Sequence, residues 1–473
     1  MNTPIYDFIT EYIDSDFSRL HMPGHKGRKF IGIEERDLTE IKGADELYDA
    51  VGIIAESEKN ATALFGTGST FYSTEGSSHV IKTMLYLAVL RYRKRRKQSS
   101  KERMTVLAAR NVHKSFVFAC ALLDLDVQWI YPENSDLSSI CTCQPDARQI
   151  EKSLTELMRN GNIPVSVFIT SPDYLGYEAD IKSITDVIRK CCTDNGLDKN
   201  EVPLLVDNAH GAYLHFLEES RHPVDLGAYM SSDSAHKTLP VITGGAYLQM
   251  SNTACEELRS EVKNALSMFG STSPSYLILQ SLDLCNRYLD AEYREKIAET
   301  IERLNKLKKT LNNMVYGGKY IIDTEPLKLV VNAGVIGITG YELGEIIRNF
   351  KVEPEFTDVN YVVLMFAPES SGEDFERVKE ALKIASENRK SACREKNKND
   401  VQLVSLDKVM TIREAVFSPH LIVPVDEAED RICGQTTVSC PPAIPIAVSG
   451  ERITKKAIEL FKAYNVTEIS IVE

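Results

Sequence analysis

Apolar runs rich in β-type residues alternate with amphipathic segments from about Thr62 to Leu248. The runs MTVLAA, VQWIYP, VSVFIT, PLLVD and GAYLQM are predicted strands. Segments between them, such as ARQIEKSLTELMRN and DIKSITDVIRKCC, repeat apolar residues at helical spacing. This alternation predicts an α/β fold with a mostly parallel sheet and helices on both faces. Ligands of such sheets bind at the carboxyl ends of the strands, which directs attention to the residues that follow them.

The chain of 473 residues is long enough for more than one domain. We expect an N-terminal arm at residues 1–60, a large α/β domain at 61–310 and a smaller C-terminal α+β domain at 311–473. A long helical stretch from about Ser275 to Asn313 leads out of the large domain. The segments YGGKYIIDTEPLKLVVNAG, NYVVLMFAPES and DFERVKEALKIASENRK then predict the smaller domain, and SACREKNKNDVQ predicts a surface loop.

Acidic residues outnumber basic residues by 68 to 55, so the net charge is -13. Neither a nucleic acid nor a membrane is therefore an expected partner, whereas a cationic small substrate is favoured. The basic run RYRKRRK follows the apolar segment VIKTMLYLAVL, and a solvated helix C-terminus is the favoured interpretation.

We recognise no targeting signal and no motif for a structural metal in the sequence. The first residues, MNTPIYDFITEYIDSDF, are acidic and unlike a signal peptide, and no apolar run has membrane-spanning length. We therefore expect a cytoplasmic protein with reduced thiols. The ten cysteines include no C-x-x-C pair, so no metal site is expected.

One glycine- and serine-rich segment suits a phosphate group. GTGSTFYSTEGSSHVIKTM places Gly76, Ser77 and Ser78 directly before a helical run. Free N–H groups at a helix N-terminus, together with two hydroxyls, bind phosphate well. A serine that caps a helix without any ligand has the same pattern, so this segment alone does not decide between the two.

Three further strand-end segments supply Asp207, His113 and Lys237. Each has an ordinary explanation by itself: an aspartate that caps a turn, a loop histidine and a surface lysine. Together they fit one chemistry. A sheltered lysine amine forms a Schiff base with an aldehyde, an aspartate holds a pyridine nitrogen protonated, and a histidine lies on an aromatic ring. With the phosphate segment, this set matches the requirements of pyridoxal 5'-phosphate (PLP).

The ordered motifs of the chain resemble those of the bacterial-type ornithine/lysine/arginine decarboxylases. These are PLP-dependent enzymes with the aspartate aminotransferase fold, also called fold type I. The matching motifs extend along nearly the whole chain: HMPGHKG, DLTEIKGADEL, RNVHKS, SPDYLGYEAD, VDNAHGAYLHF, SAHKTLP and PPAIPIAVSGE. The resemblance implies that residues 61–310 bind PLP, that the N-terminal arm contributes to the active site, and that the protein is a homodimer with active sites at the interface.

The resemblance also implies a role for each matching residue. Lys237 would bind the cofactor covalently, and Asp207 would pair with the pyridine nitrogen and so strengthen the ring as an electron acceptor. His113 would stack on one ring face and Ala209 would pack against the other. The candidate phosphate-binding residues are Gly76, Ser77, Ser78, Ser234 and His236. Lys237 or a nearby histidine would protonate the product carbon. With the two residues that contact the ring, the candidate catalytic residues are Lys237, Asp207, His113 and His236.

Several positions depart from the family pattern: Glu75 stands where Asn is common, Asn208 for Glu, Asp173 for Thr, and Cys440 and Ala443 for Tyr and Gly. A carboxylate at position 75 is unfavourable beside a phosphate unless it points away. None of these changes affects Lys237 or Asp207, so they bear on the substrate rather than on the cofactor.

Arginine is the favoured substrate, giving agmatine and CO2, because compact members without an extra N-terminal domain are often arginine decarboxylases of polyamine biosynthesis. Lysine giving cadaverine and ornithine giving putrescine are the alternatives. Glu355 and Asp358 are candidate acidic partners for the substrate, although surface exposure is the simpler expectation for both.

Two other classes of function remain open. A non-catalytic regulatory paralogue could bind PLP, but it would need neither Lys237 nor Asp207. A metal-dependent hydrolase would use the histidines His21, His25, His210 and His236. The first two lie in HMPGHKG, which predicts a rigid loop, so their spacing is poor evidence for ligands on one helical face.

Overall fold

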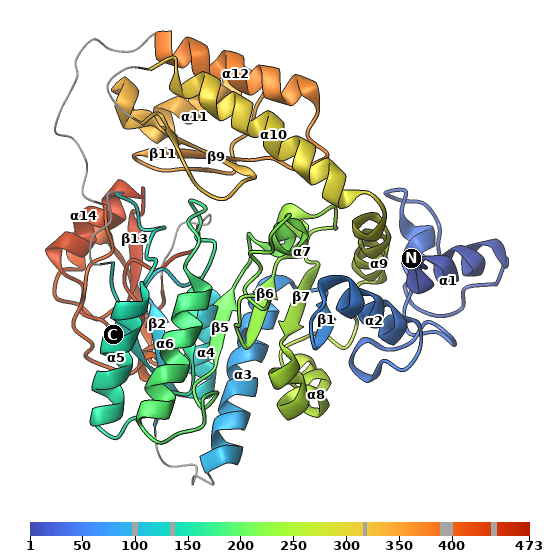
Figure 1. The fold of residues 1–473 in the computed structure, drawn as a ribbon, viewed down its shortest axis with the longest axis horizontal. Helices are drawn as coiled ribbons and strands as arrows, with labels where there is room; N and C mark the ends of the chain where they lie inside the picture. The colour runs from blue at the N-terminus through green and yellow to red at the C-terminus, as the bar shows by residue number, and fades with distance from the viewer. Residues whose placement is uncertain (97–102, 133–137, 316–318, 388–400, 437–441) are drawn as a thin grey trace. The chain divides into compact units, whose positions relative to one another are not determined.

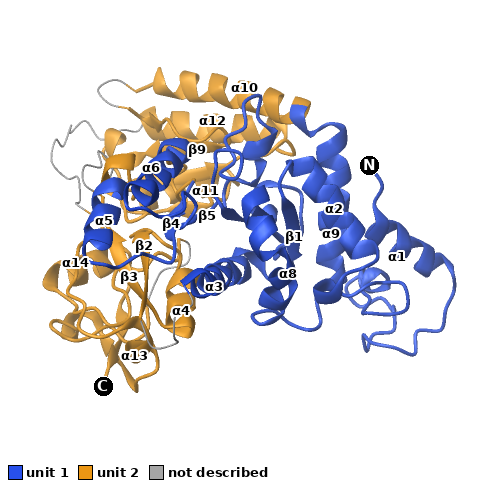
Figure 2. Ribbon diagram, turned by 60° about the horizontal axis from the view of Figure 1, so that its bottom comes forward, with its two compact units in different colours: residues 1–102, 150–171, 180–294 blue, residues 103–149, 172–179, 295–473 orange. Residues whose placement is uncertain are grey.

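The structure is a computed structural model that describes residues 1–96, 103–132, 138–315, 319–387, 401–436 and 442–473. It contains two compact units, each built from separate stretches of the chain (Figure 2). Unit 1 comprises residues 1–102, 150–171 and 180–294, and unit 2 comprises residues 103–149, 172–179 and 295–473. The predicted division into an arm and two domains stays a prediction.

Unit 1 holds five strands in the order β1-β7-β6-β5-β4. Figure 1 labels the first four of them. They are β1 (Ser69–Ser73), β4 (Val167–Thr170), β5 (Leu204–Asp207), β6 (Met230–Asp233) and β7 (Ala246–Met250). The strands β4, β5 and β6 run parallel, whereas β7 runs antiparallel to both β6 and β1. Almost every residue of these strands is buried, because helices cover the sheet.

The helices of unit 1 pack around these strands. Helix α3 (Gly76–Arg96) contacts β1, β6 and β7, and α8 (Asn252–Ser267) packs on α3. Helix α1 (Pro4–Asp14) contacts α2 (Ile53–Phe65) and α9 (Tyr276–Ala291), where the backbone N–H groups of Ile5 and Tyr6 donate to the Asp283 carboxylate. The remaining helices of this unit include α6 (Ile181–Asp194) and the short α7 (Ala235–Thr238).

Unit 2 contains the parallel pair β2 (Met104–Ala109) and β3 (Leu125–Ile130), which α4 (Lys114–Leu123) connects and covers in part. Parallel pairing occurs within each unit, between β2 and β3 in unit 2 and along β4, β5 and β6 in unit 1, which confirms the predicted α/β class. All five predicted strands are present. The sequence did not predict β1 and β6, whose compositions, STFYS and MSSD, are too polar to be recognised as buried strands.

The C-terminal part of unit 2 is a smaller α+β structure, as predicted. Its antiparallel sheet has the order β10-β11-β9-β8, with β8 (Ile321–Ile322), β9 (Lys328–Asn332), β10 (Phe356–Thr357) and β11 (Tyr361–Met365). Helices α10 (Tyr293–Asn312), α11 (Gly340–Asn349) and α12 (Gly372–Glu387) share an apolar core with it. A second core lies around β12 (His420–Pro424), β13 (Glu468–Val472) and α14 (Lys455–Ala463). Most of the predicted loop SACREKNKNDVQ, and Cys440, lie outside the described residues.

The basic run after the apolar part of α3 is a helix C-terminus, as predicted, but it is not simply solvated. Arg91 is only 3% exposed and forms an ion pair with Glu257. Arg95 pairs with Glu257 and Glu201. The run therefore joins the end of α3 to α8 and to the segment before β5. None of the described helices combines the length and the apolar character that a membrane crossing requires.

Candidate active site

Two aspartates end neighbouring parallel strands of unit 1. Asp207 is the last residue of β5, and Asp233 is the last residue of β6. Asp207 lies in register with Ser232 of β6, so the two strands end side by side. Ser234 directly follows β6 and precedes α7, which carries His236 and Lys237. The strand ends thus bring four of the predicted residues to one edge of the sheet.

The Lys237 side chain is half-buried. Its Nζ is 3.1 Å from Nε2 of the buried His210. Asp207 is buried as well, and this burial raises the pKa of its carboxyl to about 6. The positive charge of Lys237 and the N–H of Ala209, 3.3 Å away, offset only part of that effect. A second positive partner would therefore stabilise the ionised Asp207 further.

The predicted phosphate residues also come together. Gly76 begins α3 with a positive φ of 72°, and its N–H donates to the carbonyl oxygen of Gly244 at 2.7 Å. A Cβ on Gly76 would lie 4.0 Å from Cε1 of His236, so the start of α3 faces α7. The His236 ring and backbone both contact the Gly245 carbonyl, at 3.0 and 3.2 Å. The Ser232 hydroxyl donates to the Ser77 carbonyl at 3.4 Å, which ties β6 to the same turn.

The charge environment of this turn suits an anion. The first turn of α3 contains Ser77 and Ser78 and no acidic residue. The preceding Glu75 is exposed, and its carboxylate accepts a hydrogen bond from the backbone N–H of Ser271. The acidic departure from the family pattern therefore has a partner of its own. The Ser234 hydroxyl is buried without a hydrogen-bond partner among the described residues.

This donor set fits a phosphorylated pyridine aldehyde. A helix N-terminus and hydroxyls suit the phosphate, a buried carboxyl suits the ring nitrogen, and a lysine amine suits the aldehyde. The orphaned Ser234 hydroxyl is the clearest observation for such a group, because buried polar atoms in folded proteins nearly always have a partner.

A polar network that the sequence analysis did not predict lies behind these residues. The Asp233 carboxylate accepts hydrogen bonds from Asn208 at 2.8 Å and Ser231 at 3.2 Å, and lies 2.9 Å from Nε2 of His222. Burial alone would lower the pKa of His222, but the adjacent Asp233 carboxylate raises it overall. Asn208, which replaces the common Glu, thus donates to a carboxylate that a Glu would repel.

Unit 2 carries His113 and the candidate acidic residues. His113 caps α4, and its Nδ1 accepts the backbone N–H of Ser115 at 3.1 Å; its stacking role stays a prediction. Glu355 is half-buried and accepts the Tyr174 hydroxyl at 2.5 Å.

The expected surface exposure of Asp358 is wrong. Asp358 is fully buried, and its carboxylate accepts hydrogen bonds from Ser139, Tyr464 and two backbone N–H groups. Its oxygens are therefore occupied by structural partners and do not suit a substrate cation.

The four histidines considered for metal binding have separate partners. His21 contacts the Tyr12 hydroxyl at 2.7 Å, and His25 lies 3.2 Å from Asp37. His210 and His236 belong to the lysine site. Within the described ranges, no group of three or more His, Cys, Asp or Glu side chains could hold a metal ion. The geometry therefore gives no support to the hydrolase alternative.

Comparison with known families decides the assignment. Residues 3–325 match the model of the Orn/Lys/Arg decarboxylase major domain, and residues 406–469 match that of the C-terminal domain. The chain belongs to the Orn/Lys/Arg decarboxylase family. The predicted class of amino-acid decarboxylase is thereby confirmed for this family member.

Similar proteins and structures agree with the family assignment. An arginine decarboxylase of Bacillus subtilis is 29% identical to this decarboxylase over 97% of the chain and 93% of the relative. A lysine decarboxylase of Pseudomonas aeruginosa is 24% identical over 66% of the chain and 43% of the relative. The structure of a Francisella novicida lysine decarboxylase superposes on the present structure with a TM-score of 0.78 and 15% sequence identity. The match covers 100% of the present chain and 81% of the Francisella chain. That structural likeness supports the fold.

Proposed function

We propose that the protein is a PLP-dependent decarboxylase of a basic amino acid and that it converts arginine to agmatine and CO2. The observation that carries the proposal is the meeting of the Lys237 amine, the buried Asp207 carboxyl and the orphaned Ser234 hydroxyl at one edge of the sheet. Arginine is favoured over lysine and ornithine because several relatives that match nearly the whole chain are arginine decarboxylases.

The proposed roles follow from the contacts. PLP, when bound, would supply an aldehyde for the amines and a ring that accepts the electrons released with CO2. Asp207 would hold the ring nitrogen protonated, and that positive charge would in turn stabilise the ionised carboxylate. Ser77, Ser78, Ser234 and His236 would bind the phosphate, with the α3 N-terminus behind them.

His210 extends the predicted set of residues. An amine must lose its proton to attack an aldehyde, and Nε2 of His210 is 3.1 Å from the Lys237 amine. We assign His210 the exchange of that proton. From the sequence, His210 is a candidate only as a metal ligand, because its proximity to Lys237 arises when residues 27 positions apart come together on folding.

Lys237→Ala tests the proposal directly. The purified parent protein should show the visible absorbance of bound PLP and should release the amine from one of arginine, lysine and ornithine. The variant should lose that absorbance and nearly all turnover, whereas Lys182→Ala, an exposed lysine on α6, should retain both. Parental turnover in Lys237→Ala would contradict the assignment of the lysine, and activity on lysine or ornithine alone would contradict the choice of arginine.

The predicted homodimer with sites at the interface and the cytoplasmic location form part of this proposal. Light scattering coupled to size exclusion tests the dimer. Mixing Lys237→Ala with an inactive variant of a residue from the N-terminal arm tests the shared site, because mixed dimers would regain turnover only if each site draws on both chains.

A further inference from the structure

Asp233 is a fully buried carboxylate to which the proposed reaction gives no role. It ends β6 and directly precedes Ser234, from which α7 carries the chain to Lys237. Burying a carboxylate is costly unless other groups donate hydrogen bonds to it or a cation pairs with it. The partners of Asp233 therefore show which segments of the chain it holds together.

One side of Asp233 holds the end of β5 through Asn208, the residue that follows Asp207. The Asn208 side-chain amide donates to the Asp233 carboxylate at 2.8 Å, and the Asn208 backbone N–H donates to the Ser232 carbonyl at 2.9 Å. Asp207 lies in register with Ser232, so both hydrogen bonds join β5 and β6 where the strands end. Asp233 therefore helps to set the spacing between the strand that carries Asp207 and the strand that leads to Lys237.

The other side of Asp233 is held by His222, from the segment before β6. Nε2 of His222 lies 2.9 Å from the carboxylate, and both side chains are buried. The Val224 N–H donates to Nδ1 of the same ring at 3.4 Å, which leaves Nε2 to donate to Asp233. The Ser231 hydroxyl donates at 3.2 Å to the oxygen that accepts Asn208. Both oxygens of the carboxylate therefore have donors, and the strand end is held from two sides.

The bond between positions 208 and 233 needs an amide on one side and a carboxylate on the other. Asn208→Asp would place two buried carboxylates against each other, and these repel. Asp233→Asn would offer a single oxygen to donors on both sides, Asn208 and His222, so one donor would lose its acceptor. Exchanging both residues restores the bond, because the amide at position 233 then donates to the carboxylate at position 208 and keeps its oxygen for His222.

We propose that Asp233 is a positioning residue, which holds Asp207 and Lys237 at the spacing that PLP requires. This inference rests on the proposed function and deepens it, because Asp233 acts through two residues that are assigned contacts with the cofactor. A displacement of about 1 Å at reacting groups is enough to cost about a hundredfold in rate. A site held in its binding geometry also binds more tightly, so loss of the network should weaken PLP binding before any substrate is present.

Titration of the cofactor-free protein with PLP near pH 7, followed by the visible absorbance of bound PLP, tests this role. Asn208→Asp and Asp233→Asn should each weaken the affinity about tenfold, a size typical of residues coupled in one network. The combined exchange should bind PLP within about threefold of the parent. Urea unfolding of each cofactor-free protein verifies that the titrated protein is folded. If Asn208→Asp does not fold, Asp233→Asn and the combined variant decide.

Charge alone predicts a different result. Burial, and to a smaller extent the Asp233 charge, raises the pKa of Asp207. Asn208→Asp adds a negative charge beside Asp207, whereas Asp233→Asn removes one, so an electrostatic effect on PLP would have opposite signs in the two variants. A structural role without positioning would lower the urea midpoints and leave the PLP affinity of the folded variants unchanged. Weaker binding in both single variants, with recovery in the combined one, is the result that positioning predicts.

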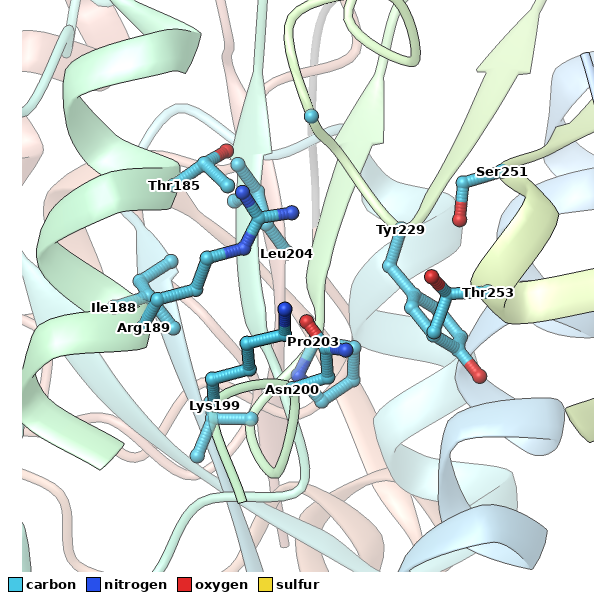
Figure 3. A pocket seen from close by; sticks show the side chains of 12 residues that line it. Thr185, Ile188, Arg189, Lys199, Asn200, Pro203, Leu204, Tyr229, Ser251 and Thr253 are labelled. Atoms are coloured by element: carbon cyan, nitrogen blue, oxygen red, sulfur yellow. The ribbon is translucent and has the colours of Figure 1, made fainter. Parts of the chain in front are cut away.

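The opposite end of β6 offers a matched control. Tyr229 directly precedes β6 and lines a hollow with Leu204, the first residue of β5 (Figure 3). The Tyr229 hydroxyl donates to Glu257 at 2.7 Å, and Glu257 also pairs with Arg91. Glu257→Gln therefore disturbs the contacts at the other end of the same strand. It should lower the urea midpoint and leave the PLP affinity within about twofold of the parent.

Parental PLP affinity in either folded single variant would overturn the positioning role. Opposite shifts in the two single variants, or no recovery in the combined one, would overturn it as well. Each of these results leaves the proposed function intact as long as the parent binds PLP through Lys237. A parent that gains no visible absorbance with PLP would instead contradict the proposed function itself, and the positioning role with it.

Discussion

Asp207→Asn should stabilise the cofactor-free protein at neutral pH while it impairs catalysis. Burial raises the pKa of Asp207 from 3.8 to about 6, so the folded protein holds its charged form less favourably than the unfolded chain does. About two pKa units correspond to about 3 kcal/mol. This cost is absent below the unfolded pKa and is complete once the pH has risen through about 6. Asparagine never carries the charge, and it keeps an oxygen for the Ala209 N–H.

The assay is urea unfolding of both proteins after removal of PLP, across a range of pH. The free-energy advantage of Asp207→Asn should grow from about 0.5 kcal/mol near pH 4 to about 3 kcal/mol near pH 8. Saturating PLP should then stabilise the parent more than the variant, because the protonated ring nitrogen compensates a carboxylate and not an amide. The variant should nevertheless lose most of its turnover, since the ring loses its fixed negative partner.

A difference between the two proteins that does not change with pH would refute this reasoning. So would a variant that is less stable than the parent near pH 8. Asp186→Asn, on the exposed face of α6, is the matched control and should show no growth of the difference with pH.

Two further substitutions test other buried charges. Asn208→Asp places a second carboxylate against Asp233, since the Asn208 amide lies 2.8 Å from that carboxylate. The variant should lose about 3 kcal/mol of unfolding free energy near pH 8 and less near pH 5, because repulsion between two carboxylates weakens as the pH falls. Equal losses in the urea midpoint at both pH values would contradict the repulsion. Arg110→Met leaves Glu451 buried without its ion pair and should cost about 3–5 kcal/mol, whereas Arg110→Met with Glu451→Gln should cost less; a double variant less stable than the single one in urea would contradict it.

The parts of the fold that could be predicted are those where one residue type dominates an element. Strands β2, β4, β5 and β7 are runs of apolar residues, and their burial needs no information from elsewhere in the chain. Strand β6 consists of Met230, two serines and Asp233, and it is buried because the aspartate finds His222 and Asn208 from other segments. Partners separated by 11 and 25 positions leave no local pattern from which a strand could be recognised.

The candidate site follows the same division. Lys237 and Asp207 could be singled out because each lies in a distinctive motif, and Asp207 ends an apolar run; their roles stay predictions. The roles of His210 and Asp233 depend on distances that arise only after the chain has folded. The one available signal was the polar segment SSDS between two apolar runs, since so polar a stretch at that place requires internal partners.

The loop after Lys237 connects two parts of the candidate site, the start of α3 and the helix α7. The Gly244 carbonyl accepts a hydrogen bond from the N–H of Gly76 at the start of α3. The Gly245 carbonyl contacts both the backbone N–H and the ring Nδ1 of His236, which precedes Lys237. Gly244 has a φ of 102°, and any side chain there would come within 2.9 Å of the Thr74 carbonyl. A substitution in this loop would therefore disturb both the start of α3 and the helix α7 that carries Lys237. Substitutions meant to change only the start of α3, or only α7, should therefore be placed at positions that contact one of these two elements and not the other.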